Sequence, residues 1–349
     1  MLLLSNFEYS PWDCGSRHGN ILSLGGAAQQ CIRLPDFEGD LLMGKSRFVH
    51  IVDDVPAINE AERLTMVVVL DGFLDAGNAS ARAARHLVEA SRTAPVVATF
   101  DVDAFHDYRA RRPAISFIRD HYENYDAPRL VVRLLRDAGD EPYLLLHGAE
   151  PDNRWEAFAK AVRDVVERLG VTQVISMGSV PMAVPHSRPL NITHHANNKD
   201  LVPDGSSFVG ELRVPSSAQS LVELRLGEWG HDMQGFVVHI PHYLAQLDYP
   251  QASVVLLERV ERAARITVDL STVRSEAVTR EEEITNYLRE HDEVAEVVQA
   301  LERQYDAFER AEASESNLLA PNQPLPTAED LGREFEQFLA GLDEGNQNE

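Results

Sequence analysis

Polar residues that could bind a ligand gather where a predicted strand ends. Residues 70–80 follow a short apolar run and precede a helix, and they include Gly72, Asp75 and Asn78. In an open parallel sheet, ligands bind at the carboxyl ends of strands, and the next helix offers free N–H groups to an anion. A tight turn with Asp75 as helix cap explains the same residues. The segment has no GxGxxG, Walker or GxSxG pattern, so both interpretations stay open.

A histidine-rich region is the second candidate. Histidines ligate zinc, but known zinc sites have a recognisable spacing such as HExxH, which is absent here. The adjacent His194 and His195 would point to opposite sides of a strand, so we expect hydrogen-bonding histidines rather than a metal site. Gly178, His186 and Arg188 complete the candidate ligand-binding set. The histidines of the region are His186, His194, His195, His239 and His242.

Two further polar segments, 101–113 and 147–155, follow predicted strands. Paired arginines in the first could fork a phosphate or a carboxylate, but a surface loop whose arginines pair with neighbouring aspartates explains it as well. In the second, Asp152 or Asn153 is expected to cap a helix. Glu150 would form a carboxylate pair with Asp75 for acid–base chemistry only if the fold brought the two together. Cys14 has no histidine partner of a known type, and no residue is assigned as catalytic.

The elements that would position these residues alternate between strands and helices. Short apolar, β-branched runs predict strands, and apolar residues at helical spacing predict helices between them. This alternation is typical of a mixed, mainly parallel sheet with helices on both faces, a three-layer α/β/α fold. The predicted strands are 65–71, 95–100, 129–135, 142–146, 171–177 and 235–240, and the predicted helices are 76–90, 154–169 and one that begins at Pro250.

Charge separates the tail from the rest of the chain. The net charge is −24, and residues 276–349 hold 20 acidic and 5 basic residues, a net of −15. We therefore predict an α/β core domain over 1–270 and an acidic helical subdomain over 271–349. The tail has one predicted helix from Asp292, a proline linker at 320–326 and a last amphipathic helix from Thr327. So acidic a chain is not expected to bind nucleic acid or anionic lipid.

Cellular location follows from features that the sequence lacks. The two cysteines, Cys14 and Cys31, make no disulfide framework, and we expect reduced thiols. No run reaches the length of a membrane span, and the first residues lack the basic region of a signal peptide. We expect a cytoplasmic protein without a cofactor.

Several segments in this order resemble the proteasome assembly chaperone 2 family, in its prokaryotic form. The resemblance covers most of residues 60–310, and no single motif decides it. The segments are Asp71-Gly-Phe-Leu-Asp-Ala-Gly-Asn78, Phe100–Tyr108 with Arg112-Pro113, His147–Asp152 with Arg154-Trp155, Met177-Gly-Ser179, Val184–Pro189, Val238–Tyr243 and Glu293–Tyr305.

The resemblance implies a fold like that of purine nucleoside phosphorylases and homo-oligomers, including trimers. Eukaryotic relatives assist proteasome assembly through a terminal hydrophobic–Tyr–X tail, and residues 345–349 lack that pattern, so we do not expect docking of that kind. We expect a non-enzymatic scaffold that binds copies of itself or another protein. The alternatives are an enzyme or binding protein for a nucleoside-like or small anionic ligand at the strand-end loops, and oligomer building alone.

Overall fold

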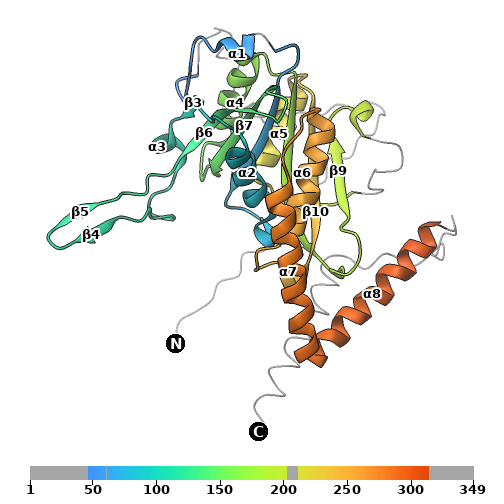
Figure 1. Ribbon diagram of the computed structural model, residues 1–349. Coiled ribbons are helices and arrows are strands. Elements are labelled where there is room, and N and C mark those ends of the chain that lie inside the picture. Colours follow the sequence, from blue (N-terminus) through green and yellow to red (C-terminus); the bar gives the residue numbers. More distant parts are fainter. Residues whose placement is uncertain (1–45, 60, 203–210, 314–349) are drawn as a thin grey trace, which may run out of the picture. The chain divides into compact units, whose positions relative to one another are not determined.

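The computed structural model describes residues 46–59, 61–202 and 211–313. Its centre is an eight-stranded sheet in the order β1-β3-β6-β7-β2-β8-β10-β9 (Figure 1). A separate two-stranded hairpin, β4-β5, projects from the chain between β3 and β6. The strands are β1 (Val49–Ile51), β2 (Thr65–Asp71), β3 (Val96–Phe100), β4 (Ser116–Ile118), β5 (His121–Glu123), β6 (Leu130–Arg136), β7 (Pro142–Ala149), β8 (Gln173–Met182), β9 (Ile192–Ala196) and β10 (Met233–Pro241).

The sheet is mixed, with parallel strands at its centre. β7, β2, β8 and β10 run parallel to one another, whereas β6 and β9 run antiparallel to their central neighbours. β3 is antiparallel to β6 and so has the direction of the central strands, and β1 reverses again. Five of the eight strands therefore share one direction, which confirms the predicted mixed, mainly parallel sheet.

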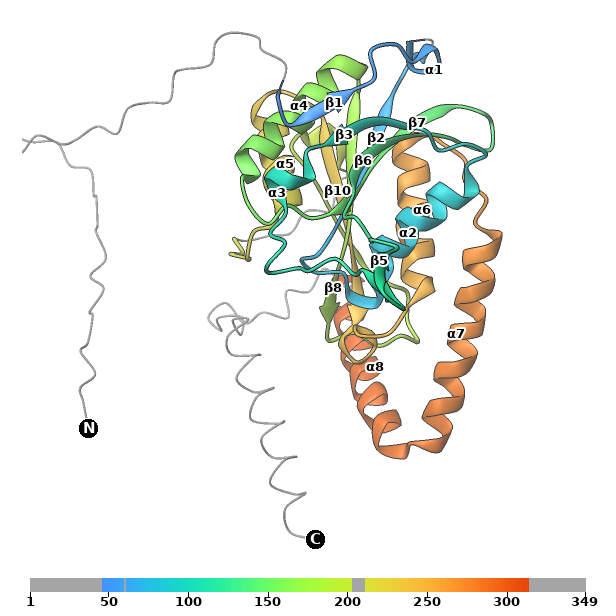
Figure 2. The same ribbon diagram turned by 90° about the vertical axis from the view of Figure 1, so that its left-hand side faces the viewer.

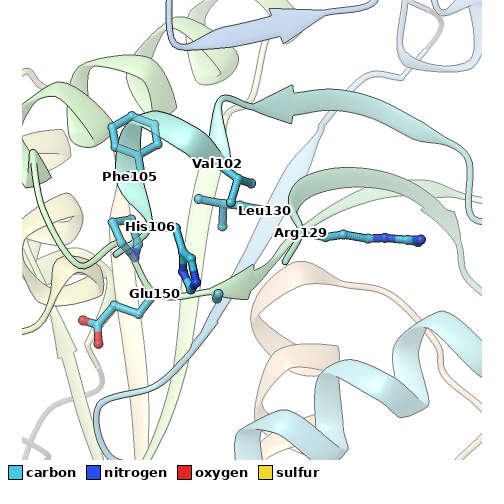
Figure 3. Close-up of a pocket in the computed structure, with 8 residues that line it drawn as sticks. Val102, Phe105, His106, Arg129, Leu130 and Glu150 are labelled. Carbon is cyan, nitrogen blue, oxygen red and sulfur yellow. The ribbon is translucent and has the colours of Figure 1, made fainter. Parts of the chain in front are cut away.

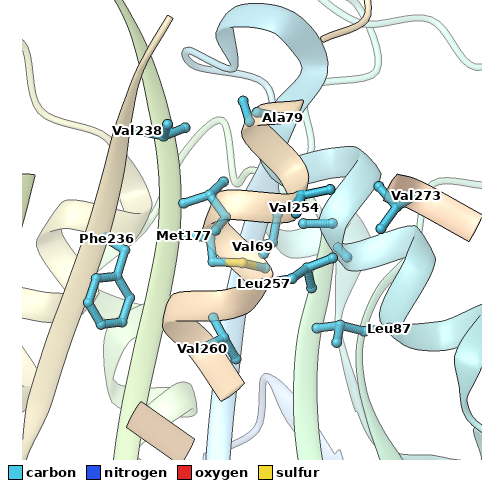
Figure 4. Packing of buried hydrophobic residues seen from close by; sticks show 14 of the residues in the cluster. Val69, Ala79, Leu87, Met177, Phe236, Val238, Val254, Leu257, Val260 and Val273 are labelled. Atoms are coloured by element: carbon cyan, nitrogen blue, oxygen red, sulfur yellow. The ribbon is translucent and has the colours of Figure 1, made fainter. Parts of the chain in front are cut away.

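Helices lie on both faces of this sheet and make the predicted three layers. α2 and α6 pack on one face together with the start of α7, and α4 and α5 pack on the other (Figures 1 and 4). Each face buries its own apolar cluster, so the hydrophobic effect holds both layers in place. The helices are α1 (Pro56–Asn59), α2 (Ala79–Ala90), α3 (Val102–Phe105), α4 (Trp155–Leu169), α5 (Ala218–Glu228), α6 (Pro250–Ala264), α7 (Ser271–Glu290) and α8 (Asp292–Ala313), with 3₁₀ turns η1 (Ala76–Asn78), η2 (Lys199–Leu201) and η3 (His242–Leu244).

Local sequence signals explain where several elements begin and end. β2 is buried along most of its length, as its continuous apolar run predicts for a central parallel strand. α4 ends at Gly170, whose φ of 69° is the left-handed conformation that glycine adopts most easily. The predicted helix over 76–90 begins later, because Gly77 and Asn78 both have positive φ and form a separate 3₁₀ turn.

Some elements were not recognised in the sequence. α5 buries only Ala218, Val222 and Leu226, too thin an apolar stripe among polar neighbours to indicate a helix. The segment after Pro113 forms the arm, defined here as residues 113–128 with β4 and β5 at its tip, which extends away from the helical layers (Figure 1). Cys14, Cys31, the linker at 320–326 and the helix predicted from Thr327 lie outside the described residues.

The acidic tail enters the described structure as α7 and α8. α7 packs against α6, and α8 turns back from its end toward the sheet (Figure 2). α7 begins at Ser271, next to the predicted domain boundary at residue 270, which stays a prediction. Within the described ranges, none of the helices has the length and apolar character needed to span a membrane.

Candidate functional site

The turn after β2 needs a glycine at its first position. Gly72 has a φ of 138°, a conformation that side-chain-bearing residues rarely adopt. A Cβ at this position would lie 2.9 Å from Nη1 of Arg111 and 3.4 Å from Cβ of Glu150. Gly72 therefore lets the base of the arm and the end of β7 close on the end of β2.

Asp75 joins this turn to α2 and to β8. Its carboxylate accepts hydrogen bonds from the backbone N–H groups of Ser80 (2.8 Å) and Ala81 (2.9 Å). It also accepts from the hydroxyls of Ser80 (2.6 Å) and Ser179 (2.8 Å). These contacts confirm the predicted helix cap. They also mean that the protein's own carboxylate fills the anion-binding position at the start of α2.

Asn78 connects the same turn to the segment before α6. Its Nδ2 donates to Oδ1 of Asp248 (2.6 Å), and Arg82 pairs with the other oxygen of that carboxylate (2.9 Å). The hydrogen bond from Asn78, and then the charge of Arg82, lower the pKa of Asp248. Gly77 N–H donates to the carbonyl of Ala245 (2.8 Å), so η1 lies beside η3. Of the predicted ligand-binding residues, Asp75 thus joins the turn to α2 and β8, and Asn78 joins it to the segment before α6.

The end of β7 forms a second polar cluster, on the other face of the sheet. Glu150 Oε1 accepts from the N–H of Ala218 at the start of α5 (2.6 Å), and desolvation raises the pKa of Glu150. Arg111 pairs with Asp152 (2.7 Å) and also donates to the carbonyl of Glu150. Although desolvation opposes it, the hydrogen bond from Arg111 lowers the pKa of Asp152. Arg111 thus pairs with an aspartate, as one of the two interpretations of the 101–113 segment expected, but this aspartate lies outside the segment.

The possible carboxylate pair of Glu150 and Asp75 is not assembled. Asp75 caps α2 and Glu150 caps α5, and these helices lie on opposite faces of the sheet. A small hollow does lie beside Glu150, with His106 turned toward it (Figure 3). Its volume of about 10 Å³ has room for about one water molecule and not for a nucleoside. Its lining residues are Val102, Phe105, His106, Arg129, Leu130, Ala149, Glu150 and Pro151.

His186 lies farther along the same edge of the sheet, in the loop between β8 and β9. Its backbone N–H donates to the hydroxyl of Tyr243 (2.9 Å), and its Nδ1 lies 2.7 Å from the same hydroxyl. The hydroxyl can accept from the backbone and still either donate to Nδ1 or accept from it, so this contact fits both tautomers of His186. Desolvation lowers the pKa of His186 and raises that of Tyr243 to about 12, so both groups are neutral at pH 7.

Arg188 is engaged by the tail. Its guanidinium donates to both carboxylate oxygens of Asp306 in α8 (2.7 and 2.8 Å). Gly178 lies within β8, and a Cβ there would meet only Cγ2 of Val237, at 3.7 Å. The structure thus places the predicted set along the carboxyl edge of β2, β8 and β10, with Tyr243 linking His186 to the η1–η3 contact. Their ligand-binding role stays a prediction.

Three other histidines of the region hydrogen-bond to separate partners. His194 bonds to Gln234 (2.8 Å), His195 to Glu223 (2.6 Å) and His239 to Thr193 (2.8 Å). This is the arrangement that the sequence favoured. In the part of the chain that the structure describes, no group of three or more histidine, cysteine, aspartate or glutamate residues could hold a metal ion.

Sequence reasoning did not find the residues that the candidates contact. Four residues from distant elements each fix one of these side chains. They are Tyr243 at His186, Asp248 at Asn78, Glu223 at His195 and Asp306 at Arg188. For Tyr243 a signal existed, since it follows the His-Ile-Pro-His run after a predicted strand. The other three are charged residues among many and carry no distinguishing local pattern.

The arrangement can be compared with known proteins. Residues 69–288 match the model of the PAC2 family. The chain belongs to the PAC2 family. A structure of a Mycobacterium tuberculosis protein of unknown function is 43% identical and covers 77% of this chain and 94% of its own, with a TM-score of 0.72. A Corynebacterium glutamicum protein of unknown function is 34% identical and covers 76% of this chain and 99% of its own, with a TM-score of 0.71.

A third similar structure bears the name of a chaperone homologue. The M. tuberculosis proteasome-assembly chaperone homologue is 26% identical and covers 67% of this chain and 99% of its own, with a TM-score of 0.62. No curated protein matches the chain. The family suggested by the ordered segments in the sequence is therefore confirmed.

Proposed function

We propose that this PAC2 family protein is a non-enzymatic, proteasome-assembly-chaperone-like scaffold that binds protein and associates with copies of itself. Family membership supports a proteasome-assembly-chaperone-like protein. The observation that carries the proposal of a binding scaffold is the arm. We place the scaffold in the cytoplasm and include a trimer among its assemblies. The polar residues of the strand-end loops, which bond to one another, serve in this view to orient the surfaces that meet partners.

The arm exposes aromatic and aliphatic side chains to solvent. Phe117 is 61% exposed and Tyr122 is 68% exposed, and their rings contact each other at a centroid distance of 5.1 Å across the hairpin. Ile115, Ile118 and Tyr125 are also exposed. A two-stranded hairpin is marginally stable alone in water, and a contiguous exposed apolar patch marks a protein-binding surface. The arm therefore gains stability when another protein surface covers it.

The base of the arm is fixed in direction. Arg111 pairs with Asp152, the Asp107 N–H donates to the same carboxylate (2.6 Å), and His106 bonds to the carbonyl of Arg111 (2.9 Å). A preorganised arm loses less conformational freedom on binding than a flexible loop does. The contacts at the end of β7 thus support protein binding without any chemistry at Glu150.

Sedimentation velocity of the purified full chain tests self-association. We expect the wild type to sediment as a multiple of the 38.9 kDa protomer, and the double variant Phe117→Ser/Tyr122→Ser to sediment as the protomer. Phe308→Ser is the matched control, because Phe308 is 62% exposed but lies on α8. A monomeric wild type at micromolar concentration, or an arm variant with the wild-type mass, would refute self-association through the arm. If the wild type, and not the arm variant, recovers a different protein, the arm is the binding surface for that partner.

A small-ligand site at the strand-end loops is the second candidate. It would use Gly72, Asp75, Asn78, Gly178, His186 and Arg188 and take a nucleoside-like or small anionic ligand. The observation that favours it is their shared position at the carboxyl edge of the parallel strands, where α/β proteins bind ligands. Thermal unfolding with millimolar nucleosides and phosphate tests it, because a ligand of the native state must raise the unfolding temperature. No shift with any of these compounds would exclude them as ligands.

A further inference from the structure

The acidic helix α8 meets the loop between β8 and β9 through a forked ion pair. Arg188 donates from Nε and Nη2 to the two oxygens of Asp306, in the bidentate geometry that suits a guanidinium and a carboxylate. Glu302 lies 3.5 Å from Nη1 of Arg188 and accepts from the hydroxyl of Ser187. The hydrogen bond from Arg188 lowers the pKa of Asp306, so this carboxylate is ionised at neutral pH.

The contacting residues of α8 form one face of the helix. Glu302, Tyr305 and Asp306 have the i, i+3, i+4 spacing that places side chains together. The Tyr305 hydroxyl donates to the carbonyl of Pro189 (3.3 Å). Val298 and Leu301 are buried and extend the same face by one turn. The loop therefore contacts a defined pattern, two carboxylates flanking a tyrosine on a helix.

This contact is replaceable. The side chains of Arg188, Glu302 and Asp306 are all partly exposed, and exposed ion pairs contribute little stability because water and salt screen them. α8 is joined to α7 through His291, whose backbone is not helical, so a single residue forms the joint. A segment with the same pattern on another molecule can compete for the loop; displacing α8 exposes Val298 and Leu301, which belong to neither of the two clusters on the sheet.

We propose that the loop of residues 183–191 is a recognition site for an acidic helical segment of a partner protein, and that α8 occupies it as an internal competitor. The partner presents two carboxylates and an aromatic residue at the spacing of Glu302, Tyr305 and Asp306. Its binding displaces α8 and uncovers the loop beside His186 and Tyr243. This regulation rests on the proposed scaffold function, whereas the competition itself is a property of the isolated chain.

Thiol labelling measures displacement of α8. Val298 is 4% exposed, so in a Cys14→Ser/Cys31→Ser background a Val298→Cys thiol reacts only when α8 moves. We expect Arg188→Ala to accelerate labelling by about threefold to tenfold, the range for losing one partly exposed, charge-assisted pair. Arg303→Ala removes an exposed arginine of α8 without a contact to the loop and should leave the rate unchanged. The paired reversal Arg188→Asp/Asp306→Arg should restore slow labelling.

A peptide of residues 292–313, added at millimolar concentration, tests recognition by another molecule. We expect it to accelerate labelling of the full chain, whereas the same peptide with Glu302→Gln and Asp306→Asn should not. Equal labelling of the wild type and Arg188→Ala, or equal effects of the two peptides, including no effect of either, would overturn the proposal. Sedimentation of the same samples distinguishes failure of this proposal from failure of self-association. In the proposed function the arm, and not the loop of residues 183–191, determines the mass of the assembly, so the labelling result and the assembly mass can fail independently.

Discussion

Replacing Asp75 by alanine should destabilise the protein strongly, because its carboxylate is the common acceptor of four hydrogen bonds. The variant leaves the N–H groups of Ser80 and Ala81 without their partner, and it removes a negative charge from the start of α2. Each unmade bond costs roughly 1–2 kcal/mol, and loss of the charge at the helix terminus costs about 0.5 kcal/mol. The expected loss is about 3 kcal/mol in the free energy of unfolding, or roughly 4–6 °C in the midpoint for a chain of this length.

Urea unfolding at pH 7, followed by circular dichroism, measures this loss. Asp75→Asn keeps one acceptor oxygen and should lose about half as much. Asp120→Ala is the control, because Asp120 lies exposed at the tip of the arm and its removal should change stability by less than about 0.5 kcal/mol. A loss below about 1 kcal/mol for Asp75→Ala would refute the structural role. It would favour the ligand-binding alternative, since carboxylates kept for ligands often cost stability.

Two further predictions concern a histidine pair and a glycine. The hydrogen bond to Glu223 raises the pKa of His195, so the pair stabilises the fold below the unfolded value of about 6.5 and stops doing so as pH rises through the folded value. Because His195 is 44% exposed, solvent weakens the pair, and Glu223→Gln should lower the free energy of unfolding by only about 0.5 kcal/mol more at pH 5.5 than at pH 9. Urea unfolding at the two pH values measures this difference. An equal loss at both pH values would contradict the prediction. Gly148→Ala should cost more than about 3 kcal/mol, because the φ of Gly148 is 129° and the new Cβ would lie 2.0 Å from the carbonyl oxygen of Arg129. Gly178→Ala in β8 is the control and should cost far less. Similar melting temperatures for the two variants would show that β6 and β7 can separate.

The sheet and its helices were largely predictable because their signals are local. β2, β7 and α4 carry continuous apolar runs or a broad apolar stripe, which report burial directly. α5 was not recognised because three small or medium apolar residues suffice to bury it against the sheet. The arm was not recognised because its apolar residues are exposed, so no periodicity of burial marks them.

The positions of the candidate residues were predictable, and their contacts were not. Gly72, Asp75 and Asn78 follow a strand, and the strand order alone places them at one edge of the sheet. Their partners Ser179 and Asp248 lie 104 and 170 residues away from the residues they bind, distances over which local sequence carries no information. Arg188 is the clearest case, since only the fold of α8 shows that Asp306 occupies its guanidinium.

The central position of β2 has a consequence for how the chain is made. β2 ends at Asp71, but its two neighbours in the sheet pair through residues 144–149 and 173–176. At a synthesis rate of about 5–20 residues per second, about 5–20 s pass between the emergence of β2 and the arrival of its last partner. During that interval an apolar strand with both edges unpaired leaves the ribosome. The nascent chain therefore exposes two unpaired strand edges until β7 and β8 have been synthesised, and such edges favour aggregation.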